Sequence, residues 1–223
     1  MNKIKAAVTM RVSEEDSYKE VRNSVSDDLI VFLERQQIWP ILIPNNYPFS
    51  IDSVSDADFL LISGGNDIVT DFETSSSSYS KKVFLRNKLE IELIKHFLSV
   101  SKPIFGICHG LQIINHYFKG TLNNLNSDEH VASEHIIKFD LSCKNLWFKY
   151  DKMLVNSFHN MVIERLGKGL SVFAKDIEGN IEGICSKDKK IMACMWHPER
   201  FFSDKNAKAF NETILLDFLE KFR

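Results

Sequence analysis

Nearly continuous apolar runs alternate with amphipathic helical patterns through the first half of the chain, and this alternation restricts the possible folds most strongly. The runs occupy residues 4–10, 41–43, 58–63 and 103–107. Strands that are apolar at successive positions are buried on both faces, which is typical of a parallel sheet with helices on each side. Apolar residues at helical spacing lie between the runs, in 25–33, with Ser24 and Asp27 as the candidate cap, and in 89–98. The sequence therefore predicts an α/β fold with a mostly parallel central sheet.

The second half of the chain has a different texture. Residues 121–151 are polar and irregular, and short β-type runs follow at 153–155, 170–174, 181–185 and 191–196. Turn signals between some of these runs favour antiparallel strands joined by hairpins. Phe and Leu at helical spacing from Phe210 to Phe222 predict a final core helix, whose end is a candidate homodimer interface. Ser75–Ser78 predicts a mobile surface loop. Without repeats or linkers, residues 1–223 are expected to form one domain.

Composition argues against several classes of protein. The 223 residues carry 28 basic and 30 acidic side chains, a balance that gives no basic surface for nucleic acid. No apolar run reaches the roughly 18 residues of a membrane-spanning helix, and the apolar stretch within residues 1–11 is too short for a signal peptide. The widely spaced cysteines lack a Cys-x-x-Cys pair, which favours reduced thiols in a cytoplasm over a disulfide or zinc framework. They are Cys108, Cys143, Cys185 and Cys194.

The strongest local signal is the segment Gly106-Ile107-Cys108-His109-Gly110, which joins a buried strand to an amphipathic helical pattern. It is a nucleophile-elbow pattern with cysteine in the place of serine. Glycines on either side would let neighbouring chain pass close to a strained turn. The turn would place the sulfur at a helix N-terminus, which favours thiolate, and would point the His109 N–H toward a reacting carbonyl oxygen. The alternative is that Cys108 is an ordinary buried cysteine, as Cys143, Cys185 and Cys194 are expected to be.

A cysteine nucleophile needs a base, and His197-Pro198-Glu199 contains the best candidate. Proline holds His197 extended, and residues two apart in an extended segment point to the same side. Glu199 would then orient the imidazole, as in a catalytic triad. Alternatively, the pair forms a solvated surface turn.

The segment Gly64-Gly65-Asn66-Asp67 follows a buried strand and is the third candidate part of a site. Two glycines at the carboxyl edge of a sheet bring backbone N–H groups close to a ligand, so the segment is a candidate second oxyanion donor. The alternative is a simple turn.

These three segments, in their order along the chain, resemble the class I glutamine amidotransferase superfamily. Asn156-Ser157-Phe158-His159 resembles the Asn-Ser-x-His segment of its γ-glutamyl hydrolase branch, and 179–184 is similar to the Asp-Gly-x-Ile-Glu pattern of that branch. The resemblance covers essentially the whole chain. It implies a three-layer αβα, flavodoxin-like fold with a small antiparallel extension.

The resemblance also implies roles for individual residues. Cys108 would attack a γ-glutamyl amide and form a thioester, with His197 as acid and base and Glu199 as the orienting carboxylate. The backbone N–H groups of Gly65 and His109 would hold the oxyanion. The implied substrate-binding residues are Gly64, Gln112, Ser157, Phe158 and His159. No metal or other cofactor is expected, because the His pairs 130/135 and 109/116 lack neighbouring ligands in a metal-site pattern.

The sequence departs from the family pattern at four positions, namely His109, Lys119, Met195 and Asn87. None of these removes a catalytic group, but together they leave the substrate open. The overall character of the chain resembles the γ-glutamyl-CDP-amidate hydrolases of capsule phosphoramidate biosynthesis. A negatively charged leaving group would need cationic residues around the pocket, and the candidates are Arg11, Arg22, Arg86, His109, His130 and His159. His135 is expected to be structural or to line the pocket.

The sequence therefore predicts a cytoplasmic hydrolase that cleaves a γ-glutamyl amide or phosphoramidate with a Cys-His-Glu triad and releases glutamate. The first alternative is a glutaminase subunit that delivers ammonia to a separate synthetase partner. The second is a catalytically silent binding protein on the same fold.

Overall fold

The computed structural model describes residues 3–15, 17–45, 51–69, 77–125, 131–140, 150–200 and 202–222. Its strands are β1 (Ile4–Thr9), β2 (Arg11–Glu15), β3 (Glu20–Ser24), β4 (Ile38–Ile43), β5 (Phe59–Ile62), β6 (Ile104–Ile107), β7 (Thr121–Asn124), β8 (Val131–Phe139), β9 (Lys152–Phe158), β10 (Met161–Arg165), β11 (Ser171–Asp176), β12 (Ile181–Ser186) and β13 (Ile191–Cys194). Its helices are α1 (Asp27–Arg35), α2 (Ser78–Ser99), α3 (His109–Tyr117) and α5 (Lys205–Glu220), with a 3-10 turn η1 (Ile51–Val54).

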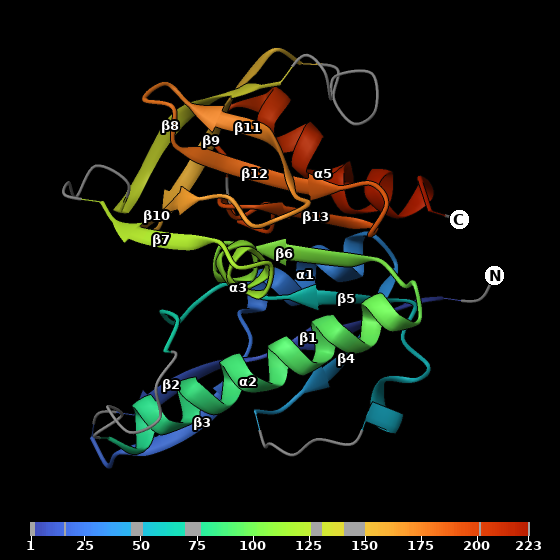
Figure 1. Cartoon of the computed structure of the whole chain (residues 1–223), viewed down its shortest axis with the longest axis vertical. Helices are drawn as coiled ribbons and strands as arrows, with labels where there is room; N and C mark the ends of the chain where they lie inside the picture. The colour runs from blue at the N-terminus through green and yellow to red at the C-terminus, as the bar shows by residue number, and fades with distance from the viewer. Residues whose placement is uncertain are drawn as a thin grey trace.

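A nine-stranded mixed sheet, in the order β4-β1-β5-β6-β13-β12-β11-β8-β9, runs through the molecule (Figure 1). The first five strands in this order are parallel. From β12 onward, each strand is antiparallel to its neighbour. The sheet is therefore the predicted parallel sheet with an antiparallel extension, and β13 lies at the junction of the two parts.

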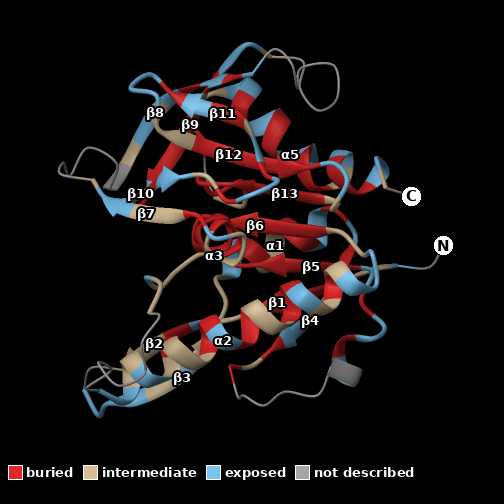
Figure 2. Cartoon of the chain, in the orientation of Figure 1, coloured by how far each residue is buried: buried red, intermediate tan, exposed pale blue. Residues whose placement is uncertain are grey.

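Helices α2 and α3 cover one face of the sheet, and α1 and α5 cover the other (Figure 1). Successive residues of β1 point to opposite faces, because Ala6 and Val8 pack with α1 and α5 while Ala7 packs with α2 and α3. The central strands are consequently buried on both sides (Figure 2), which explains their continuous apolar sequence. Across the described residues, no helix combines the length and the apolar character needed to cross a membrane.

The predicted start of the first helix is wrong by two residues. Its N-cap is Ser26, whose side chain accepts a hydrogen bond from the N–H of Leu29. Ser24 instead ends β3, where its backbone pairs with Arg11 and its hydroxyl bonds to that of Ser13. Because Ser24 pairs with β2 as the last residue of β3, it does not cap the helix as the sequence pattern predicted.

Regular structure occurs in three polar segments where the sequence analysis did not predict it. The hairpin of β2 and β3 was not predicted, and β7 and β8 lie in residues 121–151, which were expected to be irregular. In β8 only alternate side chains, such as Ile137 and Phe139, are buried, which is typical of an antiparallel strand with one wet face. Within the predicted loop Ser75–Ser78, Ser77 caps α2 and Ser78 begins it, while residues 75 and 76 lie outside the described residues.

The carboxyl ends of the parallel strands meet at one edge of the sheet. The segments that leave β1, β5, β6 and β13 at this edge contain Arg11, Gly64, Cys108 and His197. In open α/β sheets, ligands bind at this edge, so the fold brings the three predicted site segments together.

Candidate active site

Cys108 occupies a strained turn between β6 and α3. Its backbone has φ 49° and ψ −100°, and a positive φ is uncommon for a residue with a Cβ and occurs often at functional sites. Its N–H donates to the carbonyl of Cys194 in β13 at 2.8 Å, and its carbonyl accepts from the N–H groups of Leu111 and Gln112 at 2.9 and 3.2 Å. The turn therefore has the geometry that the nucleophile-elbow pattern predicts.

Both glycines of the elbow are required for steric reasons. A Cβ on Gly110 would lie 2.4 Å from the carbonyl oxygen of Ile62 in β5, and a Cβ on Gly106 would lie 2.8 Å from the backbone of Gly110. Neither position has room for a larger residue, because α3 packs directly on the sheet at this point.

His197 and Glu199 form a buried ion pair next to the nucleophile. The Nδ1 of His197 lies 2.7 Å from Oε1 of Glu199, and each side chain is 4% exposed. Because a carboxylate only accepts, Nδ1 donates, which leaves Nε2 available for the interaction of His197 with the side chain of Cys108. Burial opposes the charged imidazole, but Glu199 and Cys108 outweigh it and raise the pKa of His197 to about 9.

Two other side chains fix the position of His197. The amide of Asn156 in β9 accepts from the His197 N–H at 2.8 Å and donates to the His197 carbonyl at 2.9 Å. A Cβ on Gly64 would lie 2.6 Å from Cε1 of the imidazole, so this glycine lets the ring approach the loop closely. The ring of Phe158 contacts the imidazole edge-on, with centroids 5.5 Å apart.

The predicted oxyanion donors, Gly65 and His109, have free backbone N–H groups. Within the described parts of the chain, neither N–H has a protein acceptor. His109 is the first residue of α3, where the helix leaves N–H groups unpaired. These two N–H groups come from the loop and the helix that flank the predicted nucleophile and base.

A buried ion pair on α2 holds the loop that contains Gly65. Arg86 and Glu90, one turn apart, are both 0% exposed, and their Nε and Oε1 atoms lie 2.8 Å apart. The guanidinium also donates to the carbonyls of Ser63 and Gly65 at 2.7 and 3.0 Å, and to Oδ1 of Asn66 at 2.9 Å. One side chain therefore anchors three residues of the loop.

The imidazole of His109 joins this network from α3. Its Nδ1 lies 2.8 Å from the carbonyl of Asn66, and its Nε2 lies 2.7 Å from Oε2 of Glu90. Because the carbonyl only accepts, Nδ1 carries a hydrogen, and a further proton lies between Nε2 and the carboxylate. Burial opposes ionisation of Glu90, but Arg86 and His109 outweigh it and hold the pKa of Glu90 at about 2. Burial and Arg86 lower the pKa of His109, and the contact with Glu90 opposes this shift.

Three of the predicted pocket cations do not face the site. Arg86 and His109 turn into the interior network, with side chains 0% and 1% exposed, because they hold the loop rather than a ligand. Arg22 pairs with Glu20 at 2.9 Å on the exposed hairpin. Arg11 does lie beside the loop, and His130 lies outside the described residues.

The predicted substrate-binding residues have different surroundings. Gln112 is 4% exposed, and its Nε2 lies 3.8 Å from the sulfur of Met195. Ser157 is fully buried, whereas Phe158 is 40% exposed. Contact of these residues with a substrate stays a prediction.

His159 is buried and turns toward a carboxylate in β12. Its Nδ1 donates to the carbonyl of Met161 at 3.0 Å, and its Nε2 lies 3.4 Å from Oε1 of Glu182. His135 approaches the other oxygen of Glu182 at 3.5 Å. Glu182 is 0% exposed, and burial opposes its ionisation, but the contacts with His135 and His159 outweigh burial and lower the pKa of this carboxylate.

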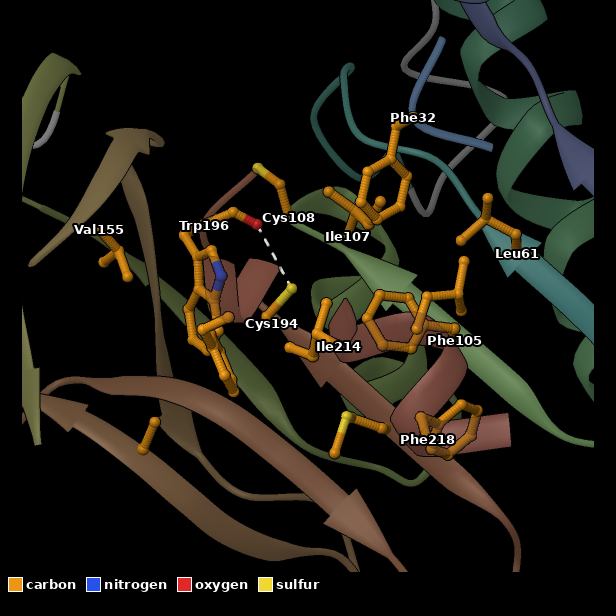
Figure 3. Close-up of a cluster of buried hydrophobic side chains, with 14 of the residues drawn as sticks. Phe32, Leu61, Phe105, Ile107, Cys108, Val155, Cys194, Trp196, Ile214 and Phe218 are labelled. Atoms are coloured by element: carbon orange, nitrogen blue, oxygen red, sulfur yellow. Dashed lines mark hydrogen bonds between the residues drawn. The ribbon is translucent and has the colours of Figure 1, made fainter. Parts of the chain in front are cut away.

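Cys108 is distinct from the other described cysteines. Figure 3 shows it at the margin of a hydrophobic cluster that contains Cys194 and Trp196. The thiol of Cys194 is fully buried and donates to the carbonyl of Trp196 at 3.4 Å, and burial together with the nearby Glu199 raises its pKa well above the usual value. Cys185 is also buried, as predicted, and Cys143 lies outside the described residues.

Sequence reasoning missed Asn156, Glu90 and Arg200. Asn156 belongs to the Asn-Ser-x-His segment, so the resemblance pointed to it, but its contact with His197 depends on the pairing of distant strands. Glu90 follows Arg86 by four residues, which is the spacing of a helical ion pair. The guanidinium of Arg200 lies over the ring of Phe158 at 4.1 Å, and no sequence pattern indicated this contact.

Comparisons with known proteins agree with the predicted resemblance. The sequence pattern of the peptidase C26 family matches residues 4–199. The γ-glutamyl-CDP-amidate hydrolase of Campylobacter jejuni is 30% identical over 218 residues, which cover 94% of this chain and 96% of that enzyme. A Lactococcus lactis protein described as glutamine amidotransferase-like, YvdE, is 33% identical over 157 residues, which cover 64% of this chain and 66% of that protein. The crystal structure of a glutamine amidotransferase from Thermotoga maritima has a TM-score of 0.64 and 13% identity, covering 100% of this chain and 86% of that chain. The last comparison confirms the predicted fold class.

Proposed function

Because the chain belongs to the peptidase C26 family of hydrolases, we propose that it cleaves a γ-glutamyl amide or phosphoramidate and releases glutamate. The observation that carries the proposal is the interaction of Cys108 with His197, which raises the pKa of the imidazole, together with the 2.7 Å distance between Nδ1 of His197 and Glu199. The proposed nucleophile, base and orienting carboxylate are thus neighbours, and the base and the carboxylate are hydrogen-bonded, as in a catalytic triad.

The first half of the reaction forms a thioester. An imidazolium and a helix N-terminus both favour the thiolate of Cys108, which attacks the γ-carbonyl carbon. The negative charge on the carbonyl oxygen is held by the N–H groups of Gly65 and His109. As the carbon–nitrogen bond breaks, the imidazolium of His197 gives its Nε2 proton to the leaving nitrogen.

The second half regenerates the enzyme. Neutral His197 takes a proton from water as the water oxygen attacks the thioester carbon. The carbon–sulfur bond breaks, the acyl group leaves as glutamate, and the thiolate–imidazolium pair of Cys108 and His197 is restored. Glu199 keeps the imidazole oriented through both halves.

The leaving group is proposed from the near-full-length relative. The Campylobacter jejuni enzyme is named for γ-glutamyl-CDP-amidate, and a substrate of this kind fits the predicted need for cationic residues around the pocket. A place in capsule biosynthesis and a cytoplasmic location stay predictions.

The test is glutamate release from glutamine, γ-glutamyl methylamide and γ-glutamyl-CDP-amidate. Cys108→Ala should lower kcat/KM at least ~10³-fold on every substrate that turns over, because it removes the nucleophile. Cys185→Ala is the matched control, since Cys185 is buried in β12 and has no proposed part in catalysis. A glutamine-analogue electrophile should add once, at Cys108.

Two results would contradict the proposal. Turnover of glutamine alone, and only after a synthetase partner is added, would favour the glutaminase alternative. Full activity of His197→Ala would remove the assigned acid and base.

A further inference from the structure

Arg11 and Arg200 both line a narrow crevice that reaches the proposed base. The crevice is also lined by Ser63, Gly64, His197 and Glu199. Neither guanidinium forms an ion pair with a carboxylate among the described residues, and the carboxylate of Glu199 is engaged by His197. Two arginines without a carboxylate partner therefore lie where a leaving group would depart.

The side chain of Arg11 is held against the oxyanion loop. Its Cδ lies 3.0 Å from the position that a Cβ on Gly65 would occupy, and its Cβ lies 3.2 Å from the same point. The aliphatic stem therefore packs on the glycine, and the same residue lines the crevice.

A larger cavity shares Arg11 with the crevice. It has a volume of about 480 Å³ and is also lined by Ser13, Glu14, Asn66 and Tyr79, so it lies between the β2–β3 hairpin and the start of α2. This volume is within the usual range for small-molecule sites. Arg11 therefore lies between the crevice beside His197 and a space of small-molecule size.

Arg200 follows His197 by three residues and is held near it by two contacts. Its guanidinium lies 4.1 Å from the centroid of the Phe158 ring, and that ring contacts the His197 imidazole edge-on. The N–H of Arg200 also donates to the carbonyl of His197 at 3.2 Å. Its backbone and its side chain are thus both tied to the proposed base.

We propose that Arg11 and Arg200 form a subsite for a phosphorylated leaving group, with the cavity beyond Arg11 holding the rest of that group. The inference rests on the proposed function and specifies the substrate class. In a γ-glutamyl phosphoramidate the nitrogen that His197 protonates is bonded directly to phosphorus. The phosphate oxygens must then lie next to His197, in the crevice that Arg11 and Arg200 line. Ammonia or a simple amine would leave both charges without a partner.

The test compares two substrates that share the γ-glutamyl group and differ in the charge of the leaving group, γ-glutamyl-CDP-amidate and γ-glutamyl methylamide. For Arg11→Gln, the ratio of their kcat/KM values should fall by ~10- to 100-fold, since a charge-assisted hydrogen bond is lost only with the phosphorylated substrate. Arg200→Gln should lower the ratio in the same direction, and Arg11→Lys should retain most of it. Arg22→Gln is the control from the same hairpin, because Arg22 is paired with Glu20, and it should leave the ratio unchanged.

A second measurement uses inorganic pyrophosphate as a competitive inhibitor of methylamide hydrolysis. Its inhibition constant should rise by a similar factor in Arg11→Gln, and an unchanged Tm would show that the variant folds.

The outcomes separate the two proposals. If the protein hydrolyses the methylamide but not the phosphoramidate, or if Arg11→Gln lowers both activities equally, the subsite is wrong and the hydrolase stands. If glutamate is released from no γ-glutamyl compound, the proposed function and the subsite both fail.

Discussion

At the scale of single residues, His197 is held by four different kinds of contact. Glu199 fixes one ring nitrogen, Cys108 helps to raise the pKa of the imidazole, Asn156 holds the backbone, and Gly64 leaves room for the ring. The charge on the imidazole depends on the first two contacts, and its position depends on the last two. The two sets can therefore be tested separately.

The charge of His197 predicts the alkaline limit of activity. The raised pKa of about 9 means that the imidazolium needed to protonate the leaving nitrogen is present below this pH and is lost above it. We expect kcat/KM to fall with an apparent pKa near 9. In Glu199→Gln the limb should move to lower pH by about one unit or more, because the carboxylate that stabilises the imidazolium is gone. A pH profile from 6 to 10.5 measures both, and an identical alkaline limb in the variant would contradict the assignment.

The backbone contacts of Asn156 predict a different kind of loss. Asn156→Ala leaves the buried N–H of His197 without its side-chain acceptor, so we expect unfolding free energy to fall by about 1–3 kcal/mol. It should also lower kcat by ~10-fold or more while KM changes little, because Asn156 positions the base without touching the substrate. Asn160→Ala, at an exposed position just after the same strand, is the control. Equal effects of the two substitutions on kcat would show that Asn156 has no positioning role.

At the scale of elements, the sequence patterns predicted the parallel strands and their helices but not the polar hairpins. A strand such as β5, apolar at all four positions, can be predicted from its own residues, because a strand buried on both faces needs an apolar side chain at every position. The β2–β3 hairpin consists of residues such as Glu14, Glu20 and Arg22, and its existence depends on pairing rather than on composition. The same holds for β8.

The site was predictable to the extent that it follows the order of local motifs. Adjacent residues determine the local geometry of the elbow, of the His-Pro-Glu segment and of the Gly-Gly loop, so each motif could be predicted from a short stretch of sequence. The interior positions of Arg86 and His109 could not be predicted, because charged side chains are seldom fully buried and only the three-dimensional arrangement provides Glu90 between them.

At the scale of the whole molecule, the Arg86–Glu90–His109 network joins α2, α3 and the loop after β5. Its central carboxylate has a folded pKa of about 2, against 4.5 for an unperturbed Glu. A depressed pKa contributes stability above pH 4.5, and this contribution is lost as pH falls toward 2. Acid should therefore weaken the connection between the loop and the two helices before it affects most of the apolar core.

We expect the difference in unfolding free energy between the wild type and Glu90→Gln to shrink by about 1 kcal/mol from pH 5 to pH 3.5. Urea unfolding at several pH values measures this difference. Glu92→Gln, on the same helix and partly exposed, should show no such trend. A constant difference for Glu90→Gln across this pH range would mean that the carboxylate is not held ionised by its neighbours.

The central place of β13 in the sheet has a consequence for biosynthesis. In this strand the carbonyl of Cys194 accepts a hydrogen bond from the N–H of Cys108, and the chain continues from it directly to His197. The strand is nevertheless synthesised long after β6, its neighbour in the sheet. Until the ribosome has released it, the gap next to β6 stays empty and the thiol has no base. The nascent chain therefore carries an unactivated cysteine from the synthesis of Cys108 until His197 has been added, and reactivity arises only when this late segment completes the middle of the sheet.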